Sequence, residues 1–159
     1  LSVDQQEGEL KQFSLKETIS SVISVVLKSQ NKNNVKYDIV GDDVIIENYY
    51  EGLNLVFLKL TENAVIHGLR DNLDGKIKVN IEELDDTVII SYFNNGIQIP
   101  EEIISRIFDP FVTENKNYGK GLGLGIVYNL IKFKLHGDIT CQNVDNGVEF
   151  RIELPIKNS

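Results

Sequence analysis

Gly119-Lys120-Gly121-Leu122-Gly123-Leu124-Gly125 places four glycines at alternate positions, directly before a stretch with helical periodicity. Alternate glycines permit positive φ and let a large anion approach the backbone amides closely. Where such a run opens a helix, free N–H groups and the positive end of the helix dipole form a phosphate site. Taken alone, the run fits a flexible turn as well as a phosphate loop. Other segments of the sequence are needed to distinguish a flexible turn from a phosphate-binding loop.

The composition indicates a globular domain with an acidic surface. The chain has 159 residues, enough for one domain with a full core, and 42% of them are hydrophobic, as in ordinary folds. Its net charge is −8 and its Lys and Arg residues are scattered, which argues against a nucleic-acid surface. An acidic protein that binds a polyanion has to concentrate positive charge locally or recruit a metal ion. We therefore expect any phosphate site to hold Mg²⁺.

Three features of the sequence bear on where the protein lies in the cell and on whether the chain is part of a longer one. The single cysteine, Cys141, excludes an internal disulfide and fits a reducing compartment. No apolar run is long enough to span a bilayer, so we expect a cytoplasmic domain without direct membrane contact. The chain contains no methionine, so we expect it to be a piece of a longer protein. Whether that parent is anchored in a membrane stays open.

Periodic apolar residues predict three long helices and six strands. The helices are expected over residues 15–29, 51–67 and 121–135, and a short fourth helix begins at Pro100. The strands are expected over residues 35–40, 44–48, 76–84, 87–93, 138–144 and 148–154, with turns at 41–43, 85–86 and 145–147. Ser14 starts a capping box, and Gly68 ends the second helix as its C′ glycine. Strands gathered on one side of three helices make a two-layer α/β sandwich, and residues 1–13 are expected to be irregular.

The end of the second predicted helix carries a carboxylate beside an amide. Helical spacing places Lys59, Glu62 or Asn63, and Ile66 or His67 on one side of this helix. Asn63 can offer an oxygen to Mg²⁺ without adding charge, and Glu62 can orient or deprotonate a nucleophile. The alternative is that Asn63 caps a fraying helix end and Glu62 is a solvated surface acid. Taken singly, these residues favour that simpler interpretation.

Two further segments carry polar or aromatic residues near predicted element ends. Residues 94–100 follow a strand, and an amide at Asn94 can reach a ligand where the backbone turns away at Gly96. An ordinary turn explains the same residues. Phe108 and Phe111 fit core packing, and the lysines that follow either pair with phosphate oxygens or are solvated.

In their order, these segments resemble the ATP-binding catalytic domain of sensor histidine kinases. The wider group includes gyrase, heat-shock protein 90 and the mismatch-repair ATPases (the GHKL superfamily). Residues 60–68 resemble the N box, 94–100 the G1 box, 107–113 the F box and 119–125 the G2 box. Four boxes in order form a specific signal. The resemblance covers the chain from about Phe13 to Pro155.

The resemblance implies the Bergerat fold, in which three helices cover one face of a mixed sheet and a lid closes over the nucleotide. Residues 14–157 would be the ATP-binding catalytic domain, and residues 1–13 a linker or the end of a preceding dimerisation helix. We expect the lid to occupy residues 112–120. The implied activity is binding of Mg-ATP and transfer of the γ-phosphate to a histidine in two-component signalling.

The same resemblance implies residue roles. Asn63 would hold Mg²⁺ against the triphosphate, and His67 would pack beside adenine or ribose. Glu62 would help to activate the accepting histidine or order the waters of the metal. Asn94 stands where relatives carry an acid that accepts a hydrogen bond from the adenine amino group. Further contacts to ATP are expected from the G1 box, the lid with its phenylalanine anchors, and the G2 box: Lys59, Gly96, Gln98, Ile99, Phe108, Phe111, Lys116, Tyr118, Gly119, Lys120, Gly121, Leu122, Gly123 and Leu124.

The chain departs from the family's pattern at several of these positions. Asn94 lacks the charge of the usual aspartate, a change expected to weaken binding by about 1–2 kcal/mol. Gln98 replaces the second G1 glycine, where it would crowd the pocket or reshape the turn. Lys59 stands where many relatives have asparagine, and Ile66 where they have a basic residue. These departures bear on nucleotide affinity rather than on the fold.

The two histidines, His67 and His136, do not lie on an amphipathic hairpin of the kind that displays a phosphoacceptor. We therefore expect the substrate histidine on a separate dimerisation domain of the parent, with a response regulator as the next partner. The parent would be a homodimer and the present chain a monomer. Two alternatives stay open: a degenerate regulatory docking module without kinase activity, and an anti-sigma-type serine kinase of the same fold.

Overall fold

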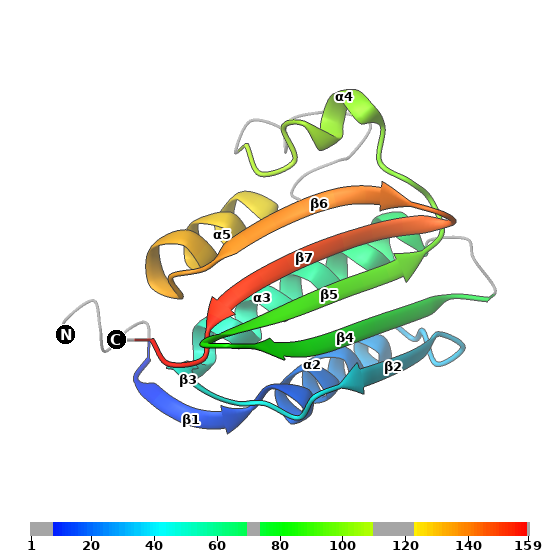
Figure 1. The fold of residues 1–159 in the computed structure, drawn as a ribbon. Helices are drawn as coiled ribbons and strands as arrows, with labels where there is room; N and C mark the ends of the chain where they lie inside the picture. The colour runs from blue at the N-terminus through cyan, green and yellow to red at the C-terminus, as the bar shows by residue number, and fades with distance from the viewer. Residues whose placement is uncertain (1–7, 70–73, 110–122, 159) are drawn as a thin grey trace.

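A five-stranded mixed sheet forms one layer of the molecule (Figure 1). The computed structural model describes residues 8–69, 74–109 and 123–158. The strand order is β2-β4-β5-β7-β6, in which β2 and β4 are parallel and the other neighbours are antiparallel. The strands are β2 (Lys36–Gly41), β4 (Lys76–Leu84), β5 (Thr87–Asn95), β6 (Asp138–Val144) and β7 (Gly147–Pro155).

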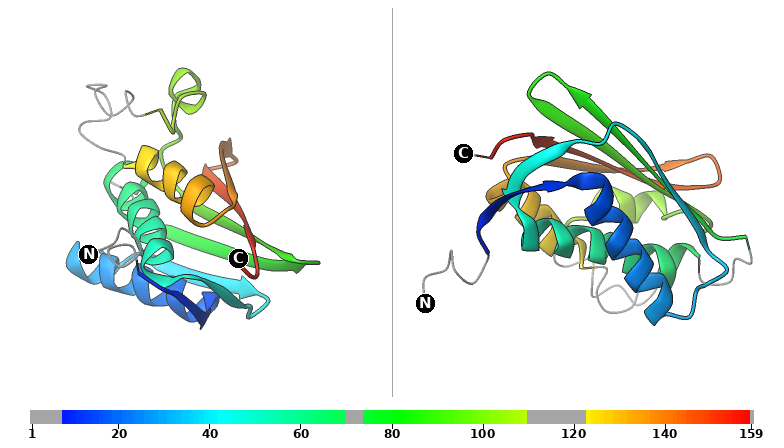
Figure 2. Two further views of the ribbon diagram at one scale, coloured as in Figure 1. Left: turned by 90° about the vertical axis from the view of Figure 1, so that its left-hand side faces the viewer. Right: turned by 90° about the horizontal axis from the view of Figure 1, so that it is seen from below.

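Helices α2 (Leu15–Ser29), α3 (Tyr50–Asn63) and α5 (Leu124–Asn129) cover one face of this sheet, as Figure 2 shows. Every second residue of the central strands is apolar and faces the helices. This alternation along the strands explains why the helices cover that face of the sheet. The α3 stripe predicted from the sequence is buried with them. These residues include Leu53, Val56, Leu60, Ala64, Ile77, Val79, Ile90, Tyr92, Phe150 and Ile152. The predicted two-layer sandwich is therefore confirmed.

Helix α4 (Glu101–Ile104) lies apart from the two layers, beyond the β6 edge of the sheet (Figure 1). Within the described residues, no helix is both long and apolar enough to cross a membrane.

Both α3 and α5 end in a π-turn. Helix α3 runs into η1 (Ala64–Gly68), where the Leu69 N–H donates to the Ala64 carbonyl at 2.8 Å. Helix α5 runs into η3 (Leu130–Lys134), and the Leu135 N–H donates to the Leu130 carbonyl at 2.8 Å. Gly68 was expected to be a C′ glycine, but it belongs to the last turn and Leu69 is the C-cap. The wider turn carries the helix one residue further than the α-helical pattern predicts.

The first strands of the chain do not form the predicted hairpin. Strand β3 (Ile45–Tyr49) pairs with β1 (Leu10–Ser14), a segment expected to be irregular, and β2 pairs with β4. Gly41 explains the difference: it has φ +100, and a Cβ there would clash with the Ile81 carbonyl of β4. The Asp42 N–H donates to that same carbonyl at 2.8 Å. Residues 41–43 therefore carry the chain from one sheet to the other.

Residues 156–158, here called the C-terminal strap, join β3 to the larger sheet. The Glu47 N–H donates to the Ile156 carbonyl at 2.8 Å, and the Asn158 N–H donates to the Glu47 carbonyl at 2.9 Å. The Ile156 N–H donates to Asp86 in the β4–β5 turn at 2.9 Å. The strap thereby connects the small sheet with the β4–β5 hairpin.

Candidate functional site

The end of helix α3 is joined to the turn that follows strand β5. The Gly68 carbonyl accepts a hydrogen bond from the Ile97 N–H at 3.0 Å. Gly96 has φ +115, and a Cβ on it would clash with that carbonyl, so only glycine allows the two segments to approach so closely. A Cβ on Gly68 would in turn clash with the side-chain amide of Asn94. This close packing brings the predicted N box and G1 box together.

Asn63 is buried and lacks a partner for its side-chain oxygen. Its relative exposure is 8%, and Asn63 Oδ1 accepts no hydrogen bond from any described residue. An unsatisfied buried acceptor costs about 1–3 kcal/mol, so it indicates a site where a ligand supplies the missing partner. A neutral amide oxygen is a ligand that Mg²⁺ accepts. The residue therefore fits the metal role predicted for it.

The described residues at the end of α3 do not form a dedicated metal cage. Within residues 8–69, 74–109 and 123–158, no three His, Cys, Asp or Glu side chains gather closely enough to hold an ion. Mg²⁺ at one protein oxygen would take its other ligands from phosphate and water, as is usual for magnesium–nucleotide sites.

Lys59 and Glu62 lie where α3 faces the start of α5. Lys59 Nζ is 3.7 Å from Glu62 Oε1, and both side chains are about one-third exposed. The stem of Lys59 packs beside Gly123, because a Cβ on that glycine would lie 3.1 Å from Lys59 Cδ. Lys59 therefore places a positive charge near the start of α5. Glu62 keeps its carboxylate accessible to solvent and to a ligand.

The start of α5 is held in the conformation that the glycine run predicted. Gly123 has φ +68 and forms the N-cap, and its carbonyl accepts from the Val127 N–H at 3.3 Å. Leu124 is fully buried, so it anchors the helix and does not expose a side chain to a ligand.

Asn94 lies at the end of β5 and is 2% exposed. Its Nδ2 donates to the Asn95 carbonyl at 3.1 Å. Neighbouring Asn95 turns its side chain the other way, where Oδ1 accepts from the Lys76 N–H at 2.7 Å and Nδ2 donates to the Asp74 carbonyl at 2.9 Å. The two consecutive asparagines therefore contact different segments. The Asn94 side chain lies against Gly68 at the end of α3, and the Asn95 side chain bonds to the backbone at the start of β4.

Gln98 and Ile99 are tied to strand β6. Gln98 Nε2 donates to the Val144 carbonyl at 2.7 Å. Asn143 holds Ile99 with both ends of its amide, at 2.9 Å to the N–H and 2.6 Å to the carbonyl. Of the two effects expected of Gln98, this contact favours reshaping of the turn. Asn143 lies in a strand and outside every motif, so the sequence carried no signal for this contact.

Phe108 packs into the core beside the site. Its ring centroid is 5.4 Å from that of Tyr128 and 6.4 Å from that of Phe150. His67 is half-buried on η1. The other predicted contacts lie outside the described residues, as does the expected lid: Phe111, Lys116, Tyr118, Gly119, Lys120, Gly121 and Leu122.

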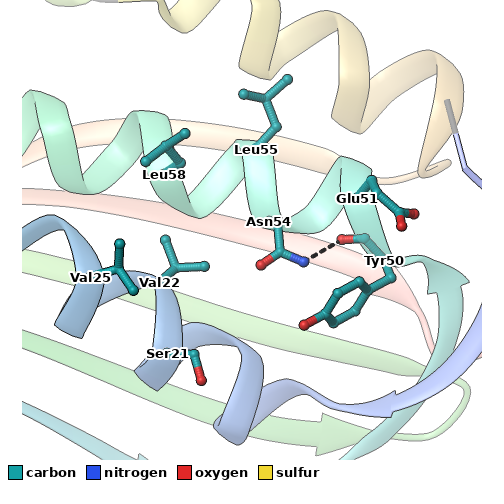
Figure 3. A pocket seen from close by; sticks show the side chains of 8 residues that line it. All are labelled: Ser21, Val22, Val25, Tyr50, Glu51, Asn54, Leu55 and Leu58. Atoms are coloured by element: carbon teal, nitrogen blue, oxygen red, sulfur yellow. Dashed lines mark hydrogen bonds between the residues drawn. The ribbon is translucent and has the colours of Figure 1, made fainter. Parts of the chain in front are cut away.

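A separate apolar hollow of about 510 Å³ lies between α2 and α3 (Figure 3). Val22 and Val25 line it from α2, and Leu55 and Leu58 from α3. Of the predicted site residues that the structure describes, none lines this hollow. Asn54, at its edge, donates to the carbonyl of Tyr50 in its own helix at 2.8 Å.

Residues 48–158 match the family model described as "Histidine kinase-, DNA gyrase B-, and HSP90-like ATPase". Sporulation kinase A of Bacillus subtilis (strain 168) is 29% identical over 162 residues, which cover 99% of this chain and 26% of the kinase. The chain spans less than a third of the length of the first curated relatives it matches.

Two solved structures are similar over nearly the whole chain. The catalytic domain of histidine kinase ThkA, in a nucleotide-free form, is 32% identical with a TM-score of 0.82, over 94% of this chain and 97% of that domain. Histidine kinase ThkA in complex with the response regulator TrrA is 30% identical with a TM-score of 0.75, over 92% of this chain and 41% of that one.

Proposed function

The chain belongs to the family of histidine kinase-, DNA gyrase B- and HSP90-like ATPases as a catalytic domain of the sensor histidine kinase type, and we propose that it binds ATP together with Mg²⁺. The buried, unpartnered oxygen of Asn63 carries this proposal. Asn63 lies at the end of α3, close in sequence to Glu62 and His67 and to Gly68, whose carbonyl accepts from Ile97 in the G1 turn. A ligand that supplied a cation there would remove the cost of the unsatisfied acceptor.

The proposed reaction is transfer of the γ-phosphate to a histidine on a separate domain of the parent. Mg²⁺, when bound, supplies charge neutralisation along the triphosphate. Asn63 would hold the metal, and Lys59 would add positive charge beside Gly123. Glu62 would accept or orient the proton of the attacking imidazole. Such chemistry depends on positioning and charge more than on covalent help from the protein.

The acceptor histidine and the response regulator are also proposed partners. His136 serves the fold, because its Nδ1 and Asn158 Oδ1 share a hydrogen bond of 2.6 Å at the C-terminal strap. His67 belongs to the predicted nucleotide site. Transfer to a histidine outside this chain is therefore the reaction that the residues support.

Calorimetric titration with a non-hydrolysable ATP analogue tests the metal role. We expect Asn63→Ala to reduce Mg²⁺-dependent affinity at least tenfold, because the variant removes the protein ligand to the ion. Asn54→Ala is the matched control, since it makes the same change on the same helix but outside the site. Equal affinity of the Asn63 variant and the wild type would refute the proposal for Asn63.

A degenerate module that binds a partner without catalysis is the second candidate. Asn94 and Gln98 favour it, because both depart from the G1 pattern and both side chains are engaged within the fold. Phosphotransfer by the full-length parent decides between the two candidates. Phosphohistidine formed with Mg-ATP would eliminate the degenerate module, and binding without transfer would support it.

A further inference from the structure

The G1 turn, residues 96–99, is held from two sides. On one side the Ile97 N–H donates to the Gly68 carbonyl at the end of helix α3, at 3.0 Å. On the other side the Gly96 N–H donates to the Asn146 carbonyl in the β6–β7 turn, at 2.8 Å. The turn therefore lies between the end of α3 and the β6–β7 hairpin.

Asn143 of strand β6 bonds to both backbone groups of Ile99. Its Oδ1 accepts from the Ile99 N–H at 2.9 Å, and its Nδ2 donates to the Ile99 carbonyl at 2.6 Å. Two residues pair in this way across an antiparallel sheet, but here a side-chain amide replaces one of the peptide groups. In the part of the chain that the structure describes, no backbone group bonds to Ile99. Since Ile99 is only 7% exposed, the two bonds from Asn143 satisfy groups that have little access to water.

The amide of Asn143 is fully engaged within the protein. Its Nδ2 also donates to Glu101 Oε1 at 3.3 Å. An asparagine amide has two donor hydrogens and one acceptor oxygen, and all three are used by these contacts. Asn63 is the contrasting case, because its buried oxygen has no partner among the described residues. Asn143 therefore holds the backbone in place, whereas Asn63 is available to a ligand.

The contacts of Asn143 lie on both sides of Pro100, where helix α4 begins. Pro100 is the N-cap of α4, and its carbonyl accepts from two N–H groups of the residues that follow. Proline has no N–H, so Pro100 cannot donate a backbone hydrogen bond to β6. The bonds from Asn143 to Ile99 and Glu101 therefore tie the G1 turn and the start of α4 to the sheet.

We propose that Asn143 is a positioning residue for the nucleotide, because it holds the G1 turn on the β6 side and so keeps the turn in place against the end of α3. This inference rests on the proposed function. Gln98 contributes to the same attachment, since its Nε2 donates to the Val144 carbonyl at 2.7 Å. Strand β6 thus takes part in ATP binding through the backbone of the turn.

This role affects binding more than phosphoryl transfer. A turn that can shift on its β6 side spends less time in the geometry that binds ATP, and the apparent affinity falls by that fraction. The groups proposed to act in transfer, Glu62 and Asn63, lie on α3 and not on the turn. Loss of Asn143 should therefore raise the KM for ATP and leave kcat nearly unchanged.

The test measures phosphohistidine formation by the full-length parent at varied Mg-ATP concentration. We expect Asn143→Ala to raise KM about tenfold and to change kcat by less than about twofold, because both bonds to the Ile99 backbone are lost. Calorimetry with a non-hydrolysable ATP analogue should show the same loss of affinity, which separates binding from later steps.

Gln142→Ala is the matched control. It removes an amide from the next position of the same strand, where the side chain is exposed on the opposite face of the sheet and bonds to Glu149 at 3.2 Å. We expect its KM and kcat to equal those of the wild type. Thermal unfolding of each variant accompanies the kinetics.

An unchanged KM in a folded Asn143→Ala variant would overturn the proposal. A fall in kcat that follows the loss of thermal stability, without a change in KM, would also overturn it, because it would indicate a structural role alone. A wild-type parent that neither binds the analogue nor transfers phosphate would instead contradict the proposed function.

Gln98→Ala is the second variant if Asn143→Ala does not fold. It removes one bond of the same attachment and leaves Asn143 in place, so we expect a smaller rise in KM, about threefold, with kcat unchanged. A KM equal to that of the wild type would then overturn the proposal.

Discussion

The hydroxyl groups of Thr61 and Tyr92 are buried together close to the site. Only one of the two needs the other as a hydrogen-bond acceptor. Thr61 Oγ1 donates to the Phe57 carbonyl at 2.7 Å and lies 2.7 Å from Tyr92 Oη. Since the threonine proton is already used, the tyrosine must be the donor in the second bond. Burial raises the pKa of Tyr92 above its ordinary value, so the hydroxyl keeps its proton throughout the neutral range. The pair therefore links α3 to β5.

The direction of this hydrogen bond predicts that removing the Thr61 hydroxyl lowers the free energy of unfolding more than removing the Tyr92 hydroxyl. Thr61→Val leaves the Tyr92 hydroxyl buried without an acceptor, and we expect a loss of about 2–3 kcal/mol in the free energy of unfolding. Tyr92→Phe leaves Thr61 bonded to Phe57, and we expect a loss of about 1 kcal/mol. Urea denaturation of both variants and of the double variant measures these terms.

The double variant is the informative comparison. We expect it to be more stable than Thr61→Val alone, because it also removes the Tyr92 hydroxyl that Thr61→Val leaves buried without an acceptor. A double variant less stable than either single one would contradict the assigned direction of the hydrogen bond.

At the scale of elements, local patterns predicted most of the fold. Helix α2 begins and ends where its periodicity indicated, and the Ser14 side chain accepts from the Glu17 N–H as the capping pattern predicts. The β4–β5 and β6–β7 hairpins follow from their turns. The pairing of β2 with β4 was not predictable in this way, because partners far apart in sequence leave no local signal.

The same distinction holds for the site. Asn63, Glu62 and Asn94 belong to short motifs, so the sequence alone could single them out as candidates. Asn143 and the contacts of Gln98 depend on how β6 packs against the G1 turn, which no motif describes. The orientation of the Asn94 amide was equally hidden, since it depends on a backbone carbonyl.

The C-terminal strap is an element that the sequence did not reveal, and it carries a prediction. Buried Asn158 donates to Asn48 Oδ1 at 2.9 Å and to the Lys134 carbonyl at 3.0 Å. Since its amino group already donates twice, its oxygen is the acceptor for His136 Nδ1. We expect Asn158→Ala to lower the free energy of unfolding by about 2–3 kcal/mol, because buried partners lose their bonds.

Lys157→Ala provides the control for the strap. This neighbour is exposed, and we expect its replacement to change the free energy of unfolding by less than about 0.5 kcal/mol. Denaturation curves of the two variants test the assignment. Equal stability of Asn158→Ala and the wild type would contradict a structural role for the strap.

At the scale of the whole molecule, the helix layer and the sheet meet at the proposed nucleotide site. Helix α3 contributes Asn63, the start of α5 contributes Gly123, and β5 contributes Asn94. A ligand held by all three would stabilise both layers at once. The net charge of −8 opposes a free triphosphate, so the metal should matter for overall stability as well as for affinity.

Thermal unfolding with and without ligand tests this coupling. At a ligand concentration one hundred times Kd, Mg-ATP should add about 2.7 kcal/mol, which raises Tm by roughly 5–10 °C in a domain of this size. We expect a much smaller shift with ATP in the presence of a chelator. The same shift in Asn63→Ala as in the wild type would contradict the proposed coupling.

The parallel pairing of β2 with β4 constrains how quickly the chain can fold. Tyr37 has to find Ile77 across the whole of α3, and Glu47 has to find Lys157 near the other end of the chain. Closing such long loops costs entropy before any contact repays it, so refolding should take milliseconds to seconds rather than microseconds. The β6–β7 hairpin needs no distant partner and can form early. Until β2 pairs, the edge of β4 that it covers in the folded sheet is exposed, and this edge is a route to aggregation.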